Sequence, residues 1–317
     1  MTLVPEALAH GTVEREGERG SVWLAELPGL VAELLGRWDC TRDGAVTHGG
    51  VGLVVPVRWR DGVPAVVKVS FPHPGNVHEP DAFEAWGGAG AVRLYARDDA
   101  RFAMLLERAR PETLAEVADG DRVVTVAARL GRRLAVPAPP GVPLLRDRAD
   151  AWEAELLRDA REVPHTLGSR AVDAAVATVR ELGGDQPDLM VHGDLHPRNV
   201  LRAEREPWLA IDPKGCAGDP AYDGGTLLKS RVPALLGADD PAGAVRRVLD
   251  VFAEAAELDR ERVYRWAQFH AVSAVFWGRR HGFRVARGGP GLDRLLDAAE
   301  RLVESLTGPG RRPGVTG

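Results

Sequence analysis

The stretch that constrains this chain most runs from residue 191 to residue 214. It reads VHGDLHPRNVL at its start and IDPK at its end, so polar side chains stand in turns between short apolar runs. Asp194, Asn199 and Asp212 carry side-chain oxygens of the kind that accept protons or bind divalent cations. The fold must therefore hold three such groups on one short segment.

The spacing within this stretch indicates a chemistry. Asp194 and Asn199 have the Asp-x-x-x-x-Asn spacing typical of a kinase catalytic loop, where the Asp accepts the substrate hydroxyl proton and the Asn holds a metal ion. Strands at Val200–Leu201 and Trp208–Ile211 are expected to form an antiparallel hairpin that brings Asn199 and Asp212 to one edge. The alternative, that the two Asp residues only cap turns, would not explain the correctly spaced Asn or the lysine described next.

A glycine-containing loop and a lysine lie far upstream. The loop with His48, Gly49, Gly50 and Gly52 leads into a strand, an Asp-Gly turn and a second β-branched strand that carries Lys68. Glycines let the backbone approach phosphates closely, although they also mark ordinary hairpin turns. A strand lysine after such a loop matches the pattern whose lysine binds the α- and β-phosphates, which favours phosphate binding over a solvated edge lysine.

A glutamate should accompany this lysine. Asn76 is expected to cap a helix that continues through Glu84, with Glu79 as the capping-box glutamate. Glu79 and Glu84 are five residues apart, so both cannot face Lys68. We prefer Glu79 as the partner of Lys68, because it lies nearer the helix start; a purely capping role is the alternative.

The chain is expected to form two lobes. Two further strands end before the polar connector 107–111, and a crossover there could offer the backbone of Glu107 and Ala109 to an adenine edge. The sequence becomes mainly helical from Thr113, and a largely apolar helix around His270 is expected to be central, with His270 a core residue rather than a catalytic one. The predicted parts are an N-terminal nucleotide-binding lobe, a hinge, a C-terminal catalytic and acceptor lobe and a disordered tail, at residues 1–106, 107–111, 112–306 and 307–317.

Composition excludes several classes of protein. The 317 residues carry a net charge of −5, which argues against a nucleic-acid partner. No apolar run approaches the length of a membrane span, and the N-terminus lacks the layout of a signal peptide. Two cysteines, Cys40 and Cys216, suit a reducing cytoplasm, so we expect a cytoplasmic protein. We also expect a monomer.

The motifs together resemble the aminoglycoside phosphotransferase family. The residues HGDLHxxN from His192 are similar to its Brenner-type motif, and WLAIDPKG from Trp208 looks like its streptomycin 6-phosphotransferase and hydroxyurea phosphotransferase branch. The likeness covers about residues 47–277. It implies an α+β, bilobal protein-kinase-like fold, with a small antiparallel β-sheet in the N-lobe and a mainly helical C-lobe.

The same resemblance implies an activity. The expected enzyme moves the γ-phosphate of ATP or GTP, with Mg²⁺, to a hydroxyl of a small antibiotic, namely the 6-hydroxyl of streptomycin. Asp194 would be the catalytic base, Asn199 and Asp212 the metal ligands, and Lys68 a phosphate ligand. A proline-rich insert at 136–143 lies where such enzymes contact the acceptor, so a kinase of hydroxyurea or another small metabolite, or a nucleotide-binding pseudokinase, stays open.

Overall fold

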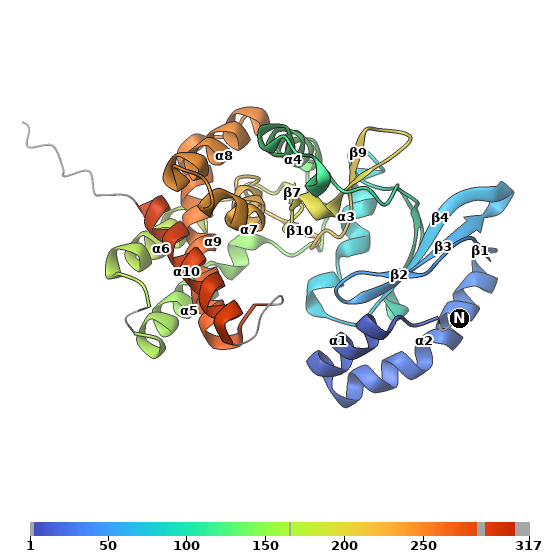
Figure 1. The fold of residues 1–317 in the computed structure, drawn as a ribbon. Helices are drawn as coiled ribbons and strands as arrows, with labels where there is room; N and C mark the ends of the chain where they lie inside the picture. The colour runs from blue at the N-terminus through green and yellow to red at the C-terminus, as the bar shows by residue number, and fades with distance from the viewer. Residues whose placement is uncertain (1–2, 165, 284–288, 308–317) are drawn as a thin grey trace, which may run out of the picture. The chain divides into compact units, whose positions relative to one another are not determined.

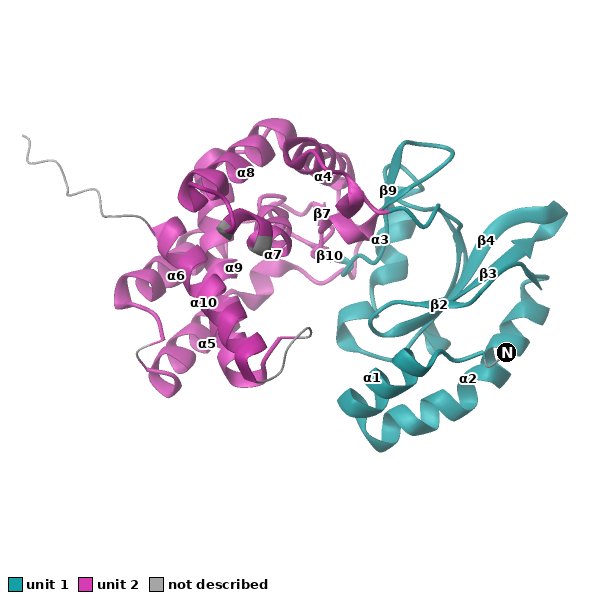
Figure 2. Ribbon diagram, viewed as in Figure 1, with its two compact units in different colours: residues 1–112, 201–215 teal, residues 113–200, 216–317 magenta. Residues whose placement is uncertain are grey.

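The computed structural model describes residues 3–164, 166–283 and 289–307. The chain divides into two compact units (Figure 2). Unit 1 comprises Met1–Glu112 and Leu201–Gly215, and unit 2 comprises Thr113–Val200 and Cys216–Gly317. The tail that the sequence predicts to be disordered lies, after Thr307, outside the described residues.

Unit 1 is built on an antiparallel sheet of six strands (Figure 1). The order is β1-β3-β4-β6-β5, and β2 also pairs with β3. The long β3–β4 hairpin is the predicted one, and Asp61 and Gly62 turn it with φ of 55° and 79°. The strands are β1 Thr41–Arg42, β2 Thr47–His48, β3 Gly52–Trp59, β4 Val63–Ser70, β5 Leu94–Asp98 and β6 Ala103–Glu107.

The described residues of unit 1 up to Glu112 also form three α-helices: α1 Glu6–Glu16, α2 Glu18–Arg37 and α3 Glu79–Trp86. Helix α2 packs an apolar stripe on the sheet, because Leu27, Val31 and Leu34 recur at helical spacing and are buried with the β3 and β4 valines. Sequence reasoning missed α1. Only Leu8 and Thr12 are buried on it, so its apolar pattern is too weak to read.

A late segment of the chain also belongs to unit 1. Strands β8 Val200–Arg202 and β9 Trp208–Ala210 pair with each other. Ala210 joins this pair to earlier residues, since its N–H donates to the Gly90 carbonyl at 2.9 Å and its carbonyl accepts from Val92 N–H at 3.1 Å. These main-chain bonds explain why residues 201–215 belong to unit 1. The sequence predicts them in the C-terminal lobe instead. The functional lobe boundaries stay a prediction.

Unit 2 is mainly helical, as Figure 2 shows. Its short strands β7 Met190–Val191 and β10 Cys216–Ala217 pair antiparallel. None of the helices in the described part of the chain combines the length and apolar character that a membrane crossing requires. The helices are α4 Gly120–Leu134, α5 Ala149–Glu162, α6 Ser169–Leu182, α7 Tyr222–Leu236, α8 Pro241–Ala256, α9 Arg260–His281 and α10 Gly289–Thr307.

Helix α9 is the central helix of unit 2, as its apolar sequence predicts. It packs against α6, α7 and α10, and Trp266, Val272 and Val275 are fully buried on it. His270 is a core residue, 5% exposed, with its ring 4.2 Å from that of Tyr222. Burial lowers the pKa of His270 well below its usual value, so the ring is neutral and packs like an apolar group.

Candidate active site

Lys68 forms the charged centre of unit 1. It lies in the middle of β4, where β3 and β6 flank it, and only 9% of the residue is exposed. Its Nζ donates to Glu79 Oε1 at 2.5 Å and to an oxygen of the Asp212 carboxylate. Burial opposes the charge, but the Asp212 and Glu79 carboxylates outweigh it and raise the pKa of Lys68. The lysine is therefore held as a cation in a buried position.

The glutamate that pairs with Lys68 is Glu79, and Glu84 points elsewhere. Glu79 is 2% exposed, whereas the Glu84 side chain is 71% exposed and pairs with Arg97 at 3.0 Å. The predicted cap is wrong in detail. His78 precedes α3 without a side-chain cap bond, and Asn76 instead closes a 3₁₀ turn by accepting from the His73 N–H at 3.1 Å. Proline at the second helical position allows α3 to start at Glu79 without that cap.

Asp212 is presented by a tightly folded turn. Asp212 and Gly215 have φ of 58° and 60°, in the left-handed region. A Cβ on Gly215 would lie 1.8 Å from the carbonyl oxygen of His78, the residue before α3. The absence of a side chain at Gly215 thus lets the Asp212 turn sit directly against the start of α3, next to Glu79.

Gly215→Ala is expected to destabilise the protein by about 2–5 kcal/mol, because it adds a backbone clash to the cost of a left-handed alanine. Gly87→Ala is the matched control, since Gly87 has φ of 54° and open space where the alanine methyl group would lie. The control should lose about 1–2 kcal/mol. Denaturant unfolding of both variants measures the difference, and equal losses would contradict the close approach at His78.

The glycine loop lies between β2 and β3 of the same unit. His48 ends β2, and its Nδ1 lies 2.9 Å from the Gly49 carbonyl. Gly49 N–H donates to the Gly52 carbonyl at 2.9 Å, which closes the turn. A Cβ on Gly52 would lie 2.9 Å from Ser70 Oγ, and one on Gly49 would lie 3.8 Å from Asp212 Oδ2. The loop therefore comes close to the Asp212 carboxylate.

Two further features of unit 1 bear on the predicted nucleotide contacts. Helix α1 reaches the glycine loop, because Arg15 Nη1 donates to the Gly50 carbonyl at 3.3 Å. Glu107 is the last residue of β6; its N–H donates to the Arg93 carbonyl at 2.8 Å, and its carboxylate pairs with Arg205. Ala109 is half-buried two residues beyond that strand. The adenine contacts of Glu107 and Ala109 stay a prediction.

The predicted catalytic loop follows β7 in unit 2. His192 is fully buried, and its Nδ1 accepts from the Asp194 N–H at 3.3 Å. Asn199 is 7% exposed, and its Nδ2 donates to the Asp194 carbonyl at 3.0 Å. His196 places Nε2 3.9 Å from Asp194 Oδ1. The loop is thus closed on itself, and the Asp194 carboxylate is half-buried rather than sealed in the core.

Sequence reasoning missed the residue that clamps this loop, Asp223. It lies in the first turn of α7 and is 2% exposed. Its carboxylate accepts from the N–H groups of His192 and Gly193, both at 2.9 Å. Burial raises the pKa of Asp223 to about 7, against the opposing effect of these two donors. The sequence signal for this role was Asp223 at the end of Gly-Asp-Pro-Ala-Tyr-Asp, but the start of a helix explains that pattern equally well.

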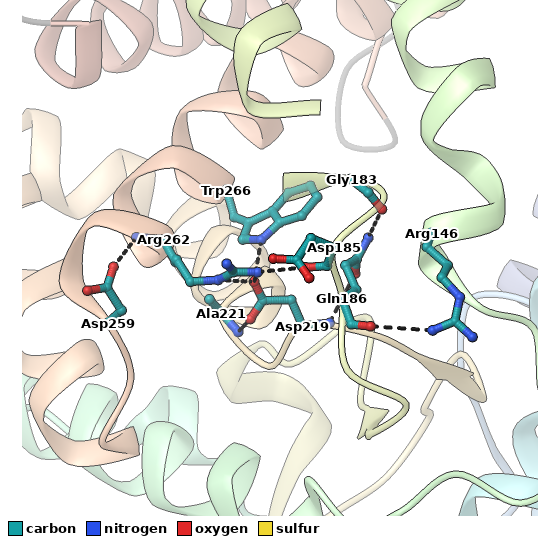
Figure 3. A network of polar contacts seen from close by, with 9 residues as sticks. All are labelled: Arg146, Gly183, Asp185, Gln186, Asp219, Ala221, Asp259, Arg262 and Trp266. Carbon is teal, nitrogen blue, oxygen red and sulfur yellow. Dashed lines mark hydrogen bonds and ion pairs between the residues drawn. The ribbon is translucent and has the colours of Figure 1, made fainter. Parts of the chain in front are cut away.

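A second aspartate, Asp219, fixes the segment that leads into α7. Figure 3 shows its carboxylate beside Arg262 and Trp266 of α9. Oδ2 accepts from Trp266 Nε1 at 2.9 Å and Arg262 Nε at 2.8 Å, and Oδ1 accepts from Ala221 N–H at 3.0 Å. The Asp219 N–H in turn donates to Gln186 Oε1 at 3.0 Å. These bonds tie the α7 entry to α9, which supports Asp223 in its position.

The predicted metal ligands belong to different units, Asp212 to unit 1 and Asn199 to unit 2. Asp212 offers carboxylate oxygens beside a lysine and a glycine loop, and Asn199 an amide oxygen in the catalytic loop. Oxygen donors of this kind fit Mg²⁺, which takes one or two protein ligands and completes its shell with phosphates and water. The donor atoms of each residue are therefore of the kind that fits a divalent cation binding together with a nucleotide.

Comparison with known proteins gives the family. The family model for aminoglycoside/hydroxyurea antibiotic resistance kinases matches residues 37–282. A streptomycin 6-kinase from Streptomyces glaucescens is 39% identical over 307 residues, which cover 96% of this chain and 97% of that protein. A hydroxyurea phosphotransferase from Kitasatospora aureofaciens is 35% identical over 86% of this chain and 79% of its own length.

Solved structures give the fold. The aminoglycoside phosphotransferase APH(4)-Ia superposes with a TM-score of 0.57 at 14% identity, over 90% of this chain and 100% of that one. This likeness confirms the predicted fold class, and the sequence matches confirm the resemblance that the motifs indicate. The chain therefore belongs to the aminoglycoside/hydroxyurea antibiotic resistance kinase family.

Proposed function

We propose that this small-molecule kinase transfers the γ-phosphate of ATP or GTP to the 6-hydroxyl of streptomycin. The observation that carries the phosphoryl-transfer part is the buried Lys68, paired with Glu79 and Asp212 beside a glycine loop. The acceptor rests on the streptomycin 6-kinase relative, which aligns over nearly the full length of both chains. The Pro-rich loop at 136–143 contributes nothing to this choice.

The proposed roles follow from the chemistry of each group. Lys68, oriented by Glu79, binds the α- and β-phosphates, and the backbone of residues 48–52 covers them. The backbone of Glu107 and Ala109 faces the adenine edge. Asp212 and Asn199 would hold Mg²⁺, which when bound would neutralise charge on the phosphate oxygens. Asp194 accepts the proton of the acceptor hydroxyl and orients its oxygen toward the phosphorus.

Hydroxyurea is the second candidate acceptor. The hydroxyurea phosphotransferase from Kitasatospora aureofaciens supports it, with 35% identity over 278 residues. Both acceptors present a hydroxyl to the same base, so the proposed site chemistry is common to them. We place streptomycin first because its relative has the higher identity and covers more of this chain.

The purified protein, incubated with Mg²⁺, should add one phosphoryl group to streptomycin but not to hydroxyurea. Mass spectrometry detects the product, NMR locates the modified oxygen, and parallel reactions with ATP and GTP give the preferred donor. Chelation of the metal with EDTA should abolish turnover, and added Mg²⁺ should restore it. Tight nucleotide binding without transfer to either acceptor would instead support a nucleotide-binding regulator.

We also propose that the enzyme acts as a monomer in the cytoplasm. Cys40 and Cys216 are both thiols rather than halves of a disulfide, which suits a reducing compartment that supplies nucleoside triphosphates. Light scattering after size-exclusion chromatography measures the molecular mass and so checks the monomer.

A further inference from the structure

Lysine is rare in this chain, and its placement is uneven. The sequence has 41 basic residues, of which only Lys68, Lys214 and Lys229 are lysines. Lys68 is the centre of the ion-pair cluster, and Lys229 lies on α7, the helix whose Asp223 clamps the catalytic loop. Arginine thus supplies nearly all the positive charge of the chain.

Lys214 lies two residues after Asp212, within the turn that presents that carboxylate. Pro213 before it and Gly215 after it are buried, whereas Lys214 is exposed. The left-handed conformations of Asp212 and Gly215, and the close approach of Gly215 to His78, fix the backbone on both sides of it. The position of the Lys214 backbone is therefore determined by the same contacts that position Asp212.

The charge of Lys214 acts on the same cluster as Lys68. Burial raises the pKa of Glu79, and the positive charges of Lys68 and Lys214 both oppose that rise. This agrees with the backbone geometry, since Gly215, the neighbour of Lys214, lies against His78, the residue before Glu79. Unit 1 thus brings two lysines and two carboxylates together next to the glycine loop.

The two lysines differ in what they can offer a ligand. Lys68 is buried, 9% exposed, and donates to Glu79 and Asp212, so a ligand can approach it only from within the cluster. Lys214 is an exposed ammonium on a flexible stem, next to the proposed metal ligand. Phosphoryl transfer spreads negative charge over the three outer oxygens of the transferring group, and kinases and GTPases place a cation there.

We propose that Lys214 is a catalytic residue that donates to the outer oxygens of the transferring γ-phosphoryl group. This inference rests on the proposed phosphotransferase function and deepens it, since it assigns the second cation of the nucleotide site. Lys214 forms no covalent bond and exchanges no proton. It stabilises the charge on the phosphoryl oxygens while the bond to the leaving oxygen breaks and the bond to the acceptor oxygen forms.

The test compares the binding of a triphosphate with that of a diphosphate. Lys214→Met removes the charge and keeps the length of the side chain, and Lys214→Arg keeps the charge. Titration calorimetry with a non-hydrolysable ATP analogue and with ADP gives both dissociation constants. We expect Lys214→Met to weaken triphosphate binding by roughly tenfold to a hundredfold and to leave ADP binding unchanged.

The kinetic part of the test uses the same variants. Lys214→Met should lower kcat by about a hundredfold or more at unchanged KM for the acceptor, and Lys214→Arg should recover most of it. Arg42→Met, which removes an exposed charge from β1, is the control and should behave like the parent protein.

The outcomes separate this inference from the proposed function. Equal weakening of ADP and triphosphate binding, or no weakening at all, would overturn the role of Lys214 while the enzyme still transfers phosphate. Absence of nucleotide binding by the parent protein would overturn the proposed function itself. Loss of turnover in Lys214→Arg as severe as in Lys214→Met would show that the position serves the fold rather than the phosphate.

Discussion

Asp194→Asn should lower kcat by about 10²–10⁴-fold and leave nucleotide binding intact. The amide cannot accept the proton of the acceptor hydroxyl, but it keeps the size of the side chain. The two bonds that close the loop both go to the Asp194 main-chain carbonyl, from His196 N–H and from Asn199 Nδ2, so they do not depend on the carboxylate. The loss should therefore appear in turnover and not in folding.

Steady-state kinetics with streptomycin, together with nucleotide titration, measure this effect. Asp188→Asn is the control, because Asp188 is an aspartate of the same unit with a side chain 59% exposed, paired with Arg146 at the surface. A variant at position 194 with undiminished kcat would remove Asp194 from the role of base and leave the proton acceptor to be found elsewhere.

Asp223→Asn should change how stability depends on pH. The folded-state pKa of Asp223 is raised to about 7 from 3.8, so the native state holds this proton more tightly than the unfolded chain does. Its contribution to stability is complete below the unfolded pKa and is lost as the pH rises through the folded pKa. Between about pH 5 and about pH 8 the free energy of unfolding of the parent protein should fall by about 3 kcal/mol, and that of the variant should not show this fall.

Denaturant unfolding at several pH values measures that difference in slope. The variant should also be less stable at low pH, since the amide nitrogen cannot accept from the second of the two backbone donors, His192 and Gly193. Asp188→Asn again controls for the loss of an aspartate. Parallel pH profiles for the parent and Asp223→Asn would mean that the carboxyl titrates alike in the folded and unfolded chain.

Much of the candidate site could be predicted because its signals are local. The Asp-x-x-x-x-Asn spacing and the strand lysine are short patterns that specific chemistry requires, and the hairpin of β3 and β4 follows from β-branched residues around an Asp-Gly turn. The choice of Glu79 over Glu84 needed only the helical period and the position of Glu79 near the helix start, and the structure pairs Glu79 with Lys68. The roles of these residues in binding and catalysis stay predictions.

Other features could not be predicted because they depend on distant partners. The partners of Asp223 lie 30 and 31 residues away, at Gly193 and His192, and nothing local separates a clamp from a helix start. The sequence after Asn76 fits a capping box, but in the structure the Asn76 side chain accepts from the His73 N–H and closes a 3₁₀ turn instead. The hairpin at 201–215 joins unit 1 through bonds to Gly90 and Val92, which no local pattern encodes.

The membership of residues 201–215 in unit 1 has a consequence for any dissection of this chain. Neither unit is a continuous stretch, because the backbone passes between the units after Glu112, after Val200 and after Gly215. A fragment ending at Glu112 would keep Lys68 and Glu79 and lose Asp212, leaving a buried ammonium with one of its two carboxylates. Unit 1 is therefore not a separable module, and the charge balance around Lys68 is reached only after two-thirds of the polypeptide has been synthesised.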